Sequence, residues 1–161
     1  MLEKDLLETG AYKKDRIGSA LRGENPTMVT RMSSGFVFLM DLQFLPGWCV
    51  LTAYPQVKDL HVLPAAKRVA FLTDMHLLGE TIEAITQPVR MNYSILGNTD
   101  QYLHAHVYPR YAWESPEHQR QPAWFYFQDD ALKGSKWALN ETHVELGEQI
   151  KQKLEALMQE Y

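Results

Sequence analysis

GNTDQYLHAHVYPR, residues 97–110, places two histidines two positions apart within an alternating apolar run. Successive side chains on a β-strand point to opposite faces, so this run predicts a strand with two unlike faces. Leu103, Ala105 and Val107 are small or branched apolar residues that suit a hydrophobic core. We expect the other face to carry chemistry, because it presents rings with polar ends, those of Tyr102, His104, His106 and Tyr108.

Turn signals and hydrophobic patterns divide the rest of the chain into alternating helices and strands. Gly and Pro mark the breaks, and Pro64 suits the first position of a helix. Strands are predicted at residues 27–32, 36–40, 48–52, 89–96 and 102–108, and helices up to about residue 21, from residue 64 and from about residue 141. The order of helix, β-meander, helix, β-hairpin and helix predicts an α+β domain.

The length of 161 residues fits one domain with a hydrophobic core, and residues 1–161 are assigned to it. The core is expected at about residues 27–112, and an aromatic-rich extension over 113–161 is expected to end in a helix. One apolar stripe of that helix is formed by Leu146, Ile150, Leu154, Leu157 and Tyr161. We favour packing of this stripe on its own chain over a contact with a second copy.

Charge and composition exclude several classes of protein. The net charge is −4 and no block of basic residues is present, which argues against a nonspecific nucleic-acid binder. No run reaches the roughly 18 apolar residues that a membrane-spanning helix needs. The single cysteine, Cys49, cannot form an internal disulfide, and residues 1–8 lack the pattern of a signal peptide. We therefore expect a cytoplasmic protein that binds neither nucleic acid nor membranes.

The residue types leave the role of the histidine pair open between metal binding and catalysis. Zinc needs three or four ligands, and His104 and His106 supply only two, so we assign no metal ligands. Cys49 lies inside a predicted strand and is interpreted as a core residue, which leaves histidine itself as nucleophile or proton carrier. The turn formed by Gly97, Asn98 and Thr99 offers N–H, amide and hydroxyl groups that suit phosphate oxygens.

At this point the chain resembles the histidine triad (HIT) family over roughly half its length, residues 36–110. The resemblance is carried, in order, by FVFLMD at 36–41, LPGWCVL at 45–51, MNYSILGN at 91–98, LHAHV at 103–107 and PR at 109–110. The Gly-Asn turn before the histidines and the Pro-Arg pair after them are most similar to the bacterial branch. Several segments in the right order make this signal much stronger than two alternating histidines.

The resemblance implies a HIT-like α+β fold, with a five-stranded antiparallel sheet, a main helix after the third strand and a C-terminal helical extension. It also implies a homodimer that binds a nucleotide and hydrolyses or transfers it at the α-phosphate. The implied substrates are nucleoside phosphoramidates or dinucleoside polyphosphates. No cofactor is expected to be required, and magnesium is expected only as a companion of a polyphosphate substrate.

Matching positions imply roles for individual residues. His104 matches the nucleophile, which attacks the α-phosphorus and forms a nucleotidyl-histidine that water then cleaves. His106 is expected to bond the phosphate or the leaving group, and Asn98 and Thr99 to contact phosphate oxygens. Asp41 matches the residue that binds the ribose diol.

One position departs from the family, because Tyr102 stands where the first histidine of the triad is expected. In the family, the backbone carbonyl of this position holds the second nitrogen of the nucleophile, and Tyr102 still supplies a carbonyl, so we expect activity to survive.

Tyr102 and Arg110 join the expected substrate-binding residues, since an arginine just after the strand could reach a phosphate. The main alternative is a nucleotide sensor with little or no turnover, and a third is a two-histidine metal site completed across a dimer.

Overall fold

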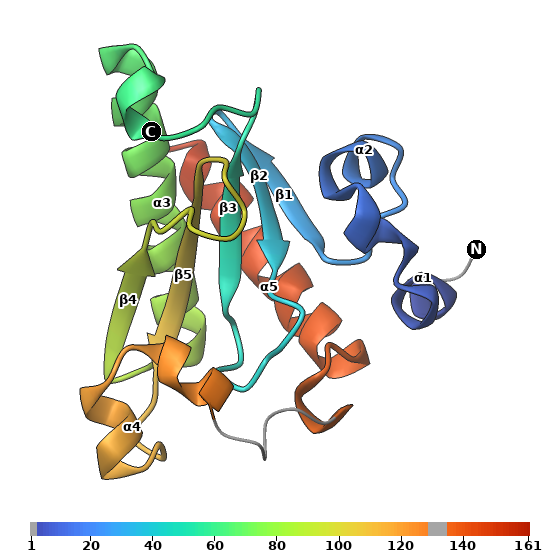
Figure 1. The fold of residues 1–161 in the computed structure, drawn as a ribbon, viewed down its shortest axis with the longest axis vertical. Helices are drawn as coiled ribbons and strands as arrows, with labels where there is room; N and C mark the ends of the chain where they lie inside the picture. The colour runs from blue at the N-terminus through green and yellow to red at the C-terminus, as the bar shows by residue number, and fades with distance from the viewer. Residues whose placement is uncertain (1–2, 129–134) are drawn as a thin grey trace.

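In the computed structural model, residues 3–128 and 135–161 are described, and their strands form one open antiparallel sheet flanked by helices (Figure 1). The strands are β1 (Met28–Met32), β2 (Gly35–Leu39), β3 (Cys49–Ala53), β4 (Arg90–Ser94) and β5 (His104–Arg110), in the spatial order β1-β2-β3-β5-β4. Each predicted strand is present, with ends shifted by at most two residues. The α+β class and the five-stranded antiparallel sheet are therefore confirmed.

The helices surround this sheet in the expected chain order. They are α1 (Glu3–Thr9), η1 (Ala11–Lys14), α2 (Arg16–Leu21), η2 (Leu60–Val62), α3 (Ala65–Thr86), α4 (Pro116–Arg120), η3 (Ala123–Gln128), η5 (Ser135–Trp137) and α5 (Glu141–Met158). The single helix expected up to about residue 21 is divided, because Gly10 adopts a left-handed φ of 60° that ends α1. Residues 129–134 of the expected C-terminal extension lie outside the described residues.

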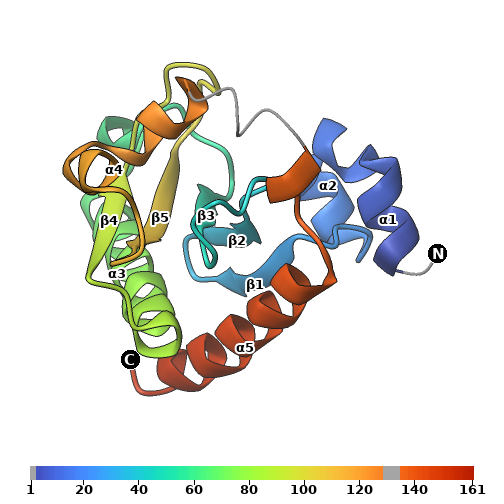
Figure 2. The same cartoon turned by 90° about the horizontal axis from the view of Figure 1, so that it is seen from below.

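The long helices α3 and α5 close one face of the sheet (Figure 2). Their fully buried residues, among them Leu78 and Ile82 of α3 and Ile150 and Leu154 of α5, pack against the apolar residues of β3 and β5, Cys49, Leu51, Ala105 and Val107. The C-terminal helix thus packs on its own chain, as the favoured interpretation of its stripe predicts, although Tyr161 at the end of the stripe is exposed. The apolar face expected for the histidine strand is the face that meets this core.

A buried carboxylate joins α3 to the turn between β1 and β2. Asp74, which is 6% exposed, accepts hydrogen bonds from the Ser33 hydroxyl at 3.0 Å, the Ser34 backbone N–H at 2.8 Å and the Ser34 hydroxyl at 2.6 Å. Three donors compensate the cost of burying this charge. The hairpin and the helix are therefore held in one fixed arrangement.

Among the described residues, two groups of side chains cover the opposite face of the sheet, one at each side. On one side, Ile17 and Ala20 of α2 pack against Phe36 and Phe38 of β2. On the other side lies a buried, mainly aromatic cluster formed by Phe44, Leu45, Trp48, Tyr108, Ala123 and Tyr126. The polar face of β5 lies between these two covers.

Among residues 3–128 and 135–161, no helix is long and apolar enough to cross a membrane.

A substitution at Gly35 tests how tightly β2 and β3 approach each other. A Cβ at this position would lie 1.9 Å from the backbone carbonyl oxygen of Thr52, so Gly35→Ala must push the strands apart. We expect urea unfolding to show a loss of about 3 kcal/mol or more in the free energy of unfolding. Gly23→Ala is the matched control, because its Cβ meets no atom of the described residues within 4 Å. Its φ of 70° alone is unfavourable, at a cost of about 1–2 kcal/mol. Equal losses for the two variants would contradict the close approach.

Candidate functional site

A cavity of about 240 Å³ opens on the polar face of the sheet, between the N-terminal segment and β5. It is lined by Arg16, Phe38, Leu39, Met40, Asp41, Val50, Thr52, Asp100, Tyr102, His104 and His106. The pairing of β3 with β5 sets Thr52 opposite His104 and Val50 opposite His106, so both histidines face the same hollow. Four of the residues predicted from the sequence, Asp41, Tyr102, His104 and His106, are thus brought together.

The orientation of the His104 ring is fixed by the backbone of a neighbouring residue. Its Nδ1 lies 2.8 Å from the carbonyl oxygen of Tyr102, and His104 is only 7% exposed. A carbonyl oxygen can only accept a hydrogen bond, so Nδ1 must carry the proton and donate it. In the neutral ring, the lone pair therefore resides on Nε2, the nitrogen that has no partner among the described residues.

The His106 ring is held by a side chain that donates to it. The indole Nε1 of Trp48 donates a hydrogen bond of 3.1 Å to Nδ1 of His106. The ring also packs edge-on against Trp124, with 4.7 Å between the ring centroids. Burial, together with the nearby His104, lowers the pKa of His106 to about 3. His106 is consequently neutral at physiological pH.

Asp41 is present in the cavity but is already bound by the N-terminal segment. The Arg16 guanidinium pairs with both carboxylate oxygens, one of them at 3.2 Å, and the Tyr12 hydroxyl donates to Oδ1 at 3.3 Å. Burial and the neighbouring Asp41 charge raise the pKa of Tyr12, so its hydroxyl stays a donor. A ligand hydroxyl at this carboxylate would have to share it with Arg16 and Tyr12.

The turn before β5 places its predicted residues less closely. Asn98 and Thr99 are exposed and do not line the cavity, whereas their neighbour Asp100 does. The ring of Tyr102 is half-buried beside His104, with 5.1 Å between the ring centroids. Burial and the negative charge of Asp100 raise the pKa of the Tyr102 hydroxyl, which therefore stays protonated.

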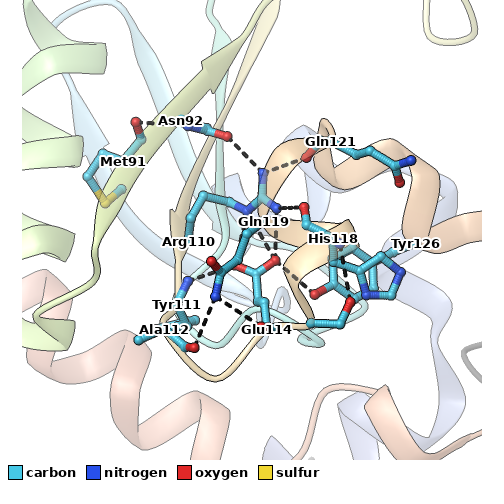
Figure 3. A network of polar contacts seen from close by, with 11 residues as sticks. Met91, Asn92, Arg110, Tyr111, Ala112, Glu114, His118, Gln119, Gln121 and Tyr126 are labelled. Atoms are coloured by element: carbon cyan, nitrogen blue, oxygen red, sulfur yellow. Dashed lines mark hydrogen bonds and ion pairs between the residues drawn. The ribbon is translucent and has the colours of Figure 1, made fainter.

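Arg110 lies outside the cavity, in a buried network of polar groups (Figure 3). It is 5% exposed, and Nη2 bonds Glu114 at 2.8 Å while Nη1 bonds the carbonyl of Gln121 at 2.8 Å and Asn92 at 3.2 Å. Nη2 also donates to the carbonyl of His118. The sequence-based expectation that Arg110 contacts a phosphate is therefore corrected, because its donors are already used to fold residues 111–126 onto the sheet.

Several residues of the site were not expected from the sequence. Arg16 holds Asp41, and Trp48 and Trp124 contact His106. Trp48 lies in LPGWCVL, a segment that was predicted to form a strand and matched to the family, but no contact with the histidines was expected of it. The contact with His106 follows because Trp48 directly precedes β3, which pairs with β5. Arg16 reaches Asp41 from a helix 25 residues away in the chain. No local pattern links these pairs. Within the part of the chain that the structure describes, no group of three or more His, Cys, Asp or Glu side chains is arranged to hold a metal ion.

Removal of the Arg110 side chain tests its structural role. Burial disfavours ionisation of Glu114, but hydrogen bonds from Arg110, the Tyr111 N–H and Tyr126 outweigh it and lower the pKa of Glu114. Arg110→Met would leave this carboxylate buried without its partner, so we expect urea unfolding at neutral pH to show a loss of about 3–5 kcal/mol.

An exposed ion pair supplies the matched control for that loss. Arg22 pairs with Glu24 at the surface, and Arg22→Met should cost less than about 1 kcal/mol. A lowered pKa of Glu114 stabilises the folded protein fully above the pKa that this carboxyl has in the unfolded chain, and this stability is lost as the pH falls through its pKa in the folded protein. The difference in unfolding free energy between wild type and Arg110→Met should therefore shrink over that pH range. A difference that stays constant with pH would contradict the role of the ion pair.

Comparison with known proteins agrees with this geometry. No protein-family model and no curated protein matches the chain. A histidine triad protein from Sinorhizobium meliloti 1021 is 19% identical, with 78% of this chain and 87% of that chain covered and a TM-score of 0.66. One from Marinobacter aquaeolei VT8 is 20% identical, with 89% and 95% covered and a TM-score of 0.62. The diadenosine triphosphate hydrolase of Plasmodium falciparum is 14% identical, with 83% and 79% covered and a TM-score of 0.60. The sequence motifs and these structures thus point the same way, and the chain has the fold of the histidine triad proteins.

Proposed function

We propose that this chain is a histidine triad hydrolase or transferase that acts at the α-phosphate of a nucleotide through a covalent nucleotidyl-histidine. The observation that carries the proposal is the 2.8 Å contact between Nδ1 of His104 and the carbonyl of Tyr102. It leaves the Nε2 lone pair of a buried histidine at a cavity large enough for part of a nucleotide. The carbonyl belongs to the backbone, so the replacement of the first triad histidine by Tyr102 does not remove this support.

His104 performs the reaction in two displacements. Nε2 attacks the α-phosphorus, and the new N–P bond forms while the bond from phosphorus to the leaving oxygen or nitrogen breaks. The leaving group departs with the electron pair and takes up a proton from water. The ring then carries positive charge, which strengthens the Nδ1–H bond to the Tyr102 carbonyl, an interaction worth about 1.5–3 kcal/mol. Water next attacks the phosphorus, the N–P bond breaks with its electron pair returning to Nε2 of His104, and the proton lost by the attacking water passes to solvent.

The surrounding residues suit a nucleotide held across the cavity. Asp41 is the candidate acceptor for ribose hydroxyls, and it would share its oxygens with Arg16 and Tyr12. Arg16 also brings positive charge to the cavity, which favours a phosphate group. Asn98 and Thr99 lie on an exposed turn beside the cavity, so their proposed phosphate contacts require the ligand to extend toward that turn.

Nucleoside phosphoramidates and dinucleoside polyphosphates are the proposed substrates, since both contain a nucleotide whose α-phosphorus bears a leaving group. The similarity in fold to a diadenosine triphosphate hydrolase supports the second class. Magnesium as a companion of a polyphosphate and the cytoplasmic location stay predictions from the sequence.

A homodimer is proposed from the free edge of the sheet. β4 is the last strand on its side, and Tyr93, Ile95 and Leu96 on or after it are 42%, 36% and 50% exposed. An unpaired strand edge with exposed apolar side chains offers hydrogen-bonding groups and apolar area to a second copy.

The covalent intermediate is tested by intact-protein mass after brief incubation with an adenosine phosphoramidate or diadenosine polyphosphate and an acid quench. Wild type should gain the mass of one adenylyl group, and His104→Ala should gain none while it keeps its affinity for nucleotide. Tyr102→Phe should form the adduct, because the carbonyl remains, and so should His61→Ala, whose imidazole is almost fully exposed outside the cavity. An adduct on His104→Ala would exclude His104 as nucleophile. Nucleotide binding with neither adduct nor turnover in wild type would identify a sensor.

The dimer is tested by sedimentation of wild type and two variants. Leu96→Lys places a charge at the proposed interface, and we expect it to shift the protein from dimer to monomer. Leu21→Lys is the matched control, because Leu21 is a similarly exposed leucine on α2, and its mass should equal that of wild type. A wild type that sediments as a monomer at every concentration would contradict the dimer.

A further inference from the structure

Trp48 determines which nitrogen of His106 carries the proton. Its indole Nε1–H donates to Nδ1 of His106 at 3.1 Å, in a contact between two buried side chains. An indole nitrogen can only donate, so Nδ1 must be the acceptor and cannot bear a proton. The single proton of the neutral ring is therefore on Nε2.

Trp48 is itself held rigidly, so this contact is not a chance approach of two mobile rings. Its side chain is fully buried, stacks on Tyr108 with 4.4 Å between centroids, and meets Phe44 edge-on at 5.3 Å. The loop that carries it is fixed by Gln43, whose amide donates to the Trp48 carbonyl at 2.9 Å and accepts from the Gly47 N–H at 2.9 Å. The direction of the indole N–H is consequently set by packing and by the backbone.

The surroundings of His106 also keep its ring uncharged. A second proton would have to go onto Nδ1, where it would oppose the indole N–H, and burial further disfavours the charged ring. A neutral imidazole holds its remaining N–H proton too strongly to release it near neutral pH. The ring can therefore donate a hydrogen bond from Nε2, but it cannot deliver that proton to a leaving group.

We propose that Trp48 is a positioning residue that holds His106 as the Nε2–H tautomer, so that His106 serves the cavity as an uncharged hydrogen-bond donor and not as a proton carrier. The tautomer follows from the contact alone. The identity of what it binds rests on the proposed function, in which the acceptor is an oxygen of the phosphoryl group attacked by His104. The two histidines are then complementary, since His104 presents a lone pair and His106 presents an N–H.

The tautomer is measured by long-range ¹H–¹⁵N correlation spectra of ¹⁵N-histidine-labelled protein, with the His106 signals assigned by their loss in His106→Gln. Wild type should show the Nε2–H pattern for His106 and the Nδ1–H pattern for His104. An Nδ1–H or doubly protonated ring at His106 in wild type would overturn the proposal. The tautomer itself is measured on wild type and requires no turnover, and His106→Gln serves only to assign the signals.

The role of Trp48 is isolated by comparing two tryptophans that both touch His106. Trp48→Phe removes the donor, and we expect the His106 signals to show a mixture of both tautomers. Trp124→Phe is the matched control, because Trp124 packs on the same ring but its buried Nε1 has no hydrogen-bond partner within residues 3–128 and 135–161. The control should keep the wild-type pattern. A pure Nε2–H pattern in folded Trp48→Phe would show that Trp48 does not set the tautomer.

Kinetics then separate a donor from a proton carrier. His106→Gln keeps an uncharged N–H donor, so its kcat should stay within about tenfold of wild type, whereas His106→Ala should lose about 10²–10³-fold, as expected for a donor that stabilises transition-state charge. Equal losses in both variants would overturn the donor role. Absence of turnover in wild type would refute the proposed function instead, and the tautomer spectra would still decide the assignment of Trp48.

Discussion

The antiparallel pairing of β3 with β5 is the constraint on which the site depends. It sets Thr52 opposite His104 and Val50 opposite His106, so the side chains of these two residue pairs lie side by side on the polar face of the sheet. One step farther along the same face, Trp48 comes beside His106. A shift of one residue in this register would turn both histidines into the apolar core and destroy the site and the core together. The fully buried residues on the other face of these strands therefore stabilise the fold and also fix the site geometry.

Within that frame, the chemistry of each imidazole is set by one neutral neighbour. A backbone carbonyl at residue 102 accepts from His104, and an indole N–H at Trp48 donates to His106. The same side-chain type is thereby given opposite properties two positions apart. Charged neighbours are not needed for this distinction, since a hydrogen bond to one ring nitrogen dictates the protonation of the other.

The segments outside the sheet complete the site, and two arginines attach them. Arg110 fixes residues 111–126 through Glu114 and the carbonyls of His118 and Gln121, which brings Trp124 against His106. Arg16 attaches α2 to Asp41 at the edge of the cavity. Both arginines are thus used for contacts within the chain. Arg16 lines the cavity and stays partly exposed there. Arg110 is buried, and its N–H donors are already bonded to the Glu114 carboxylate, to Asn92 and to two backbone carbonyls.

The sequence determined the elements of this protein and the face on which its chemistry lies. Alternation within residues 102–108 was enough to separate the core side of β5 from the histidine side, because the period of a strand is a local property. Gly and Pro located the breaks, and the apolar stripe of residues 146–157 identified a helix that packs on its own chain. The carbonyl of residue 102 also followed from the sequence, since every residue supplies one.

Only the tertiary structure decided the partners of the side chains. The sequence gives no sign that Arg110 is buried against Glu114, that Arg16 occupies Asp41, or that Trp48 donates to His106. The last two contacts join residues 25 and 58 positions apart in the chain. Side-chain partners at such separations depend on strand register, on helix docking and on which groups are removed from water, and none of these is encoded in a local pattern of residues.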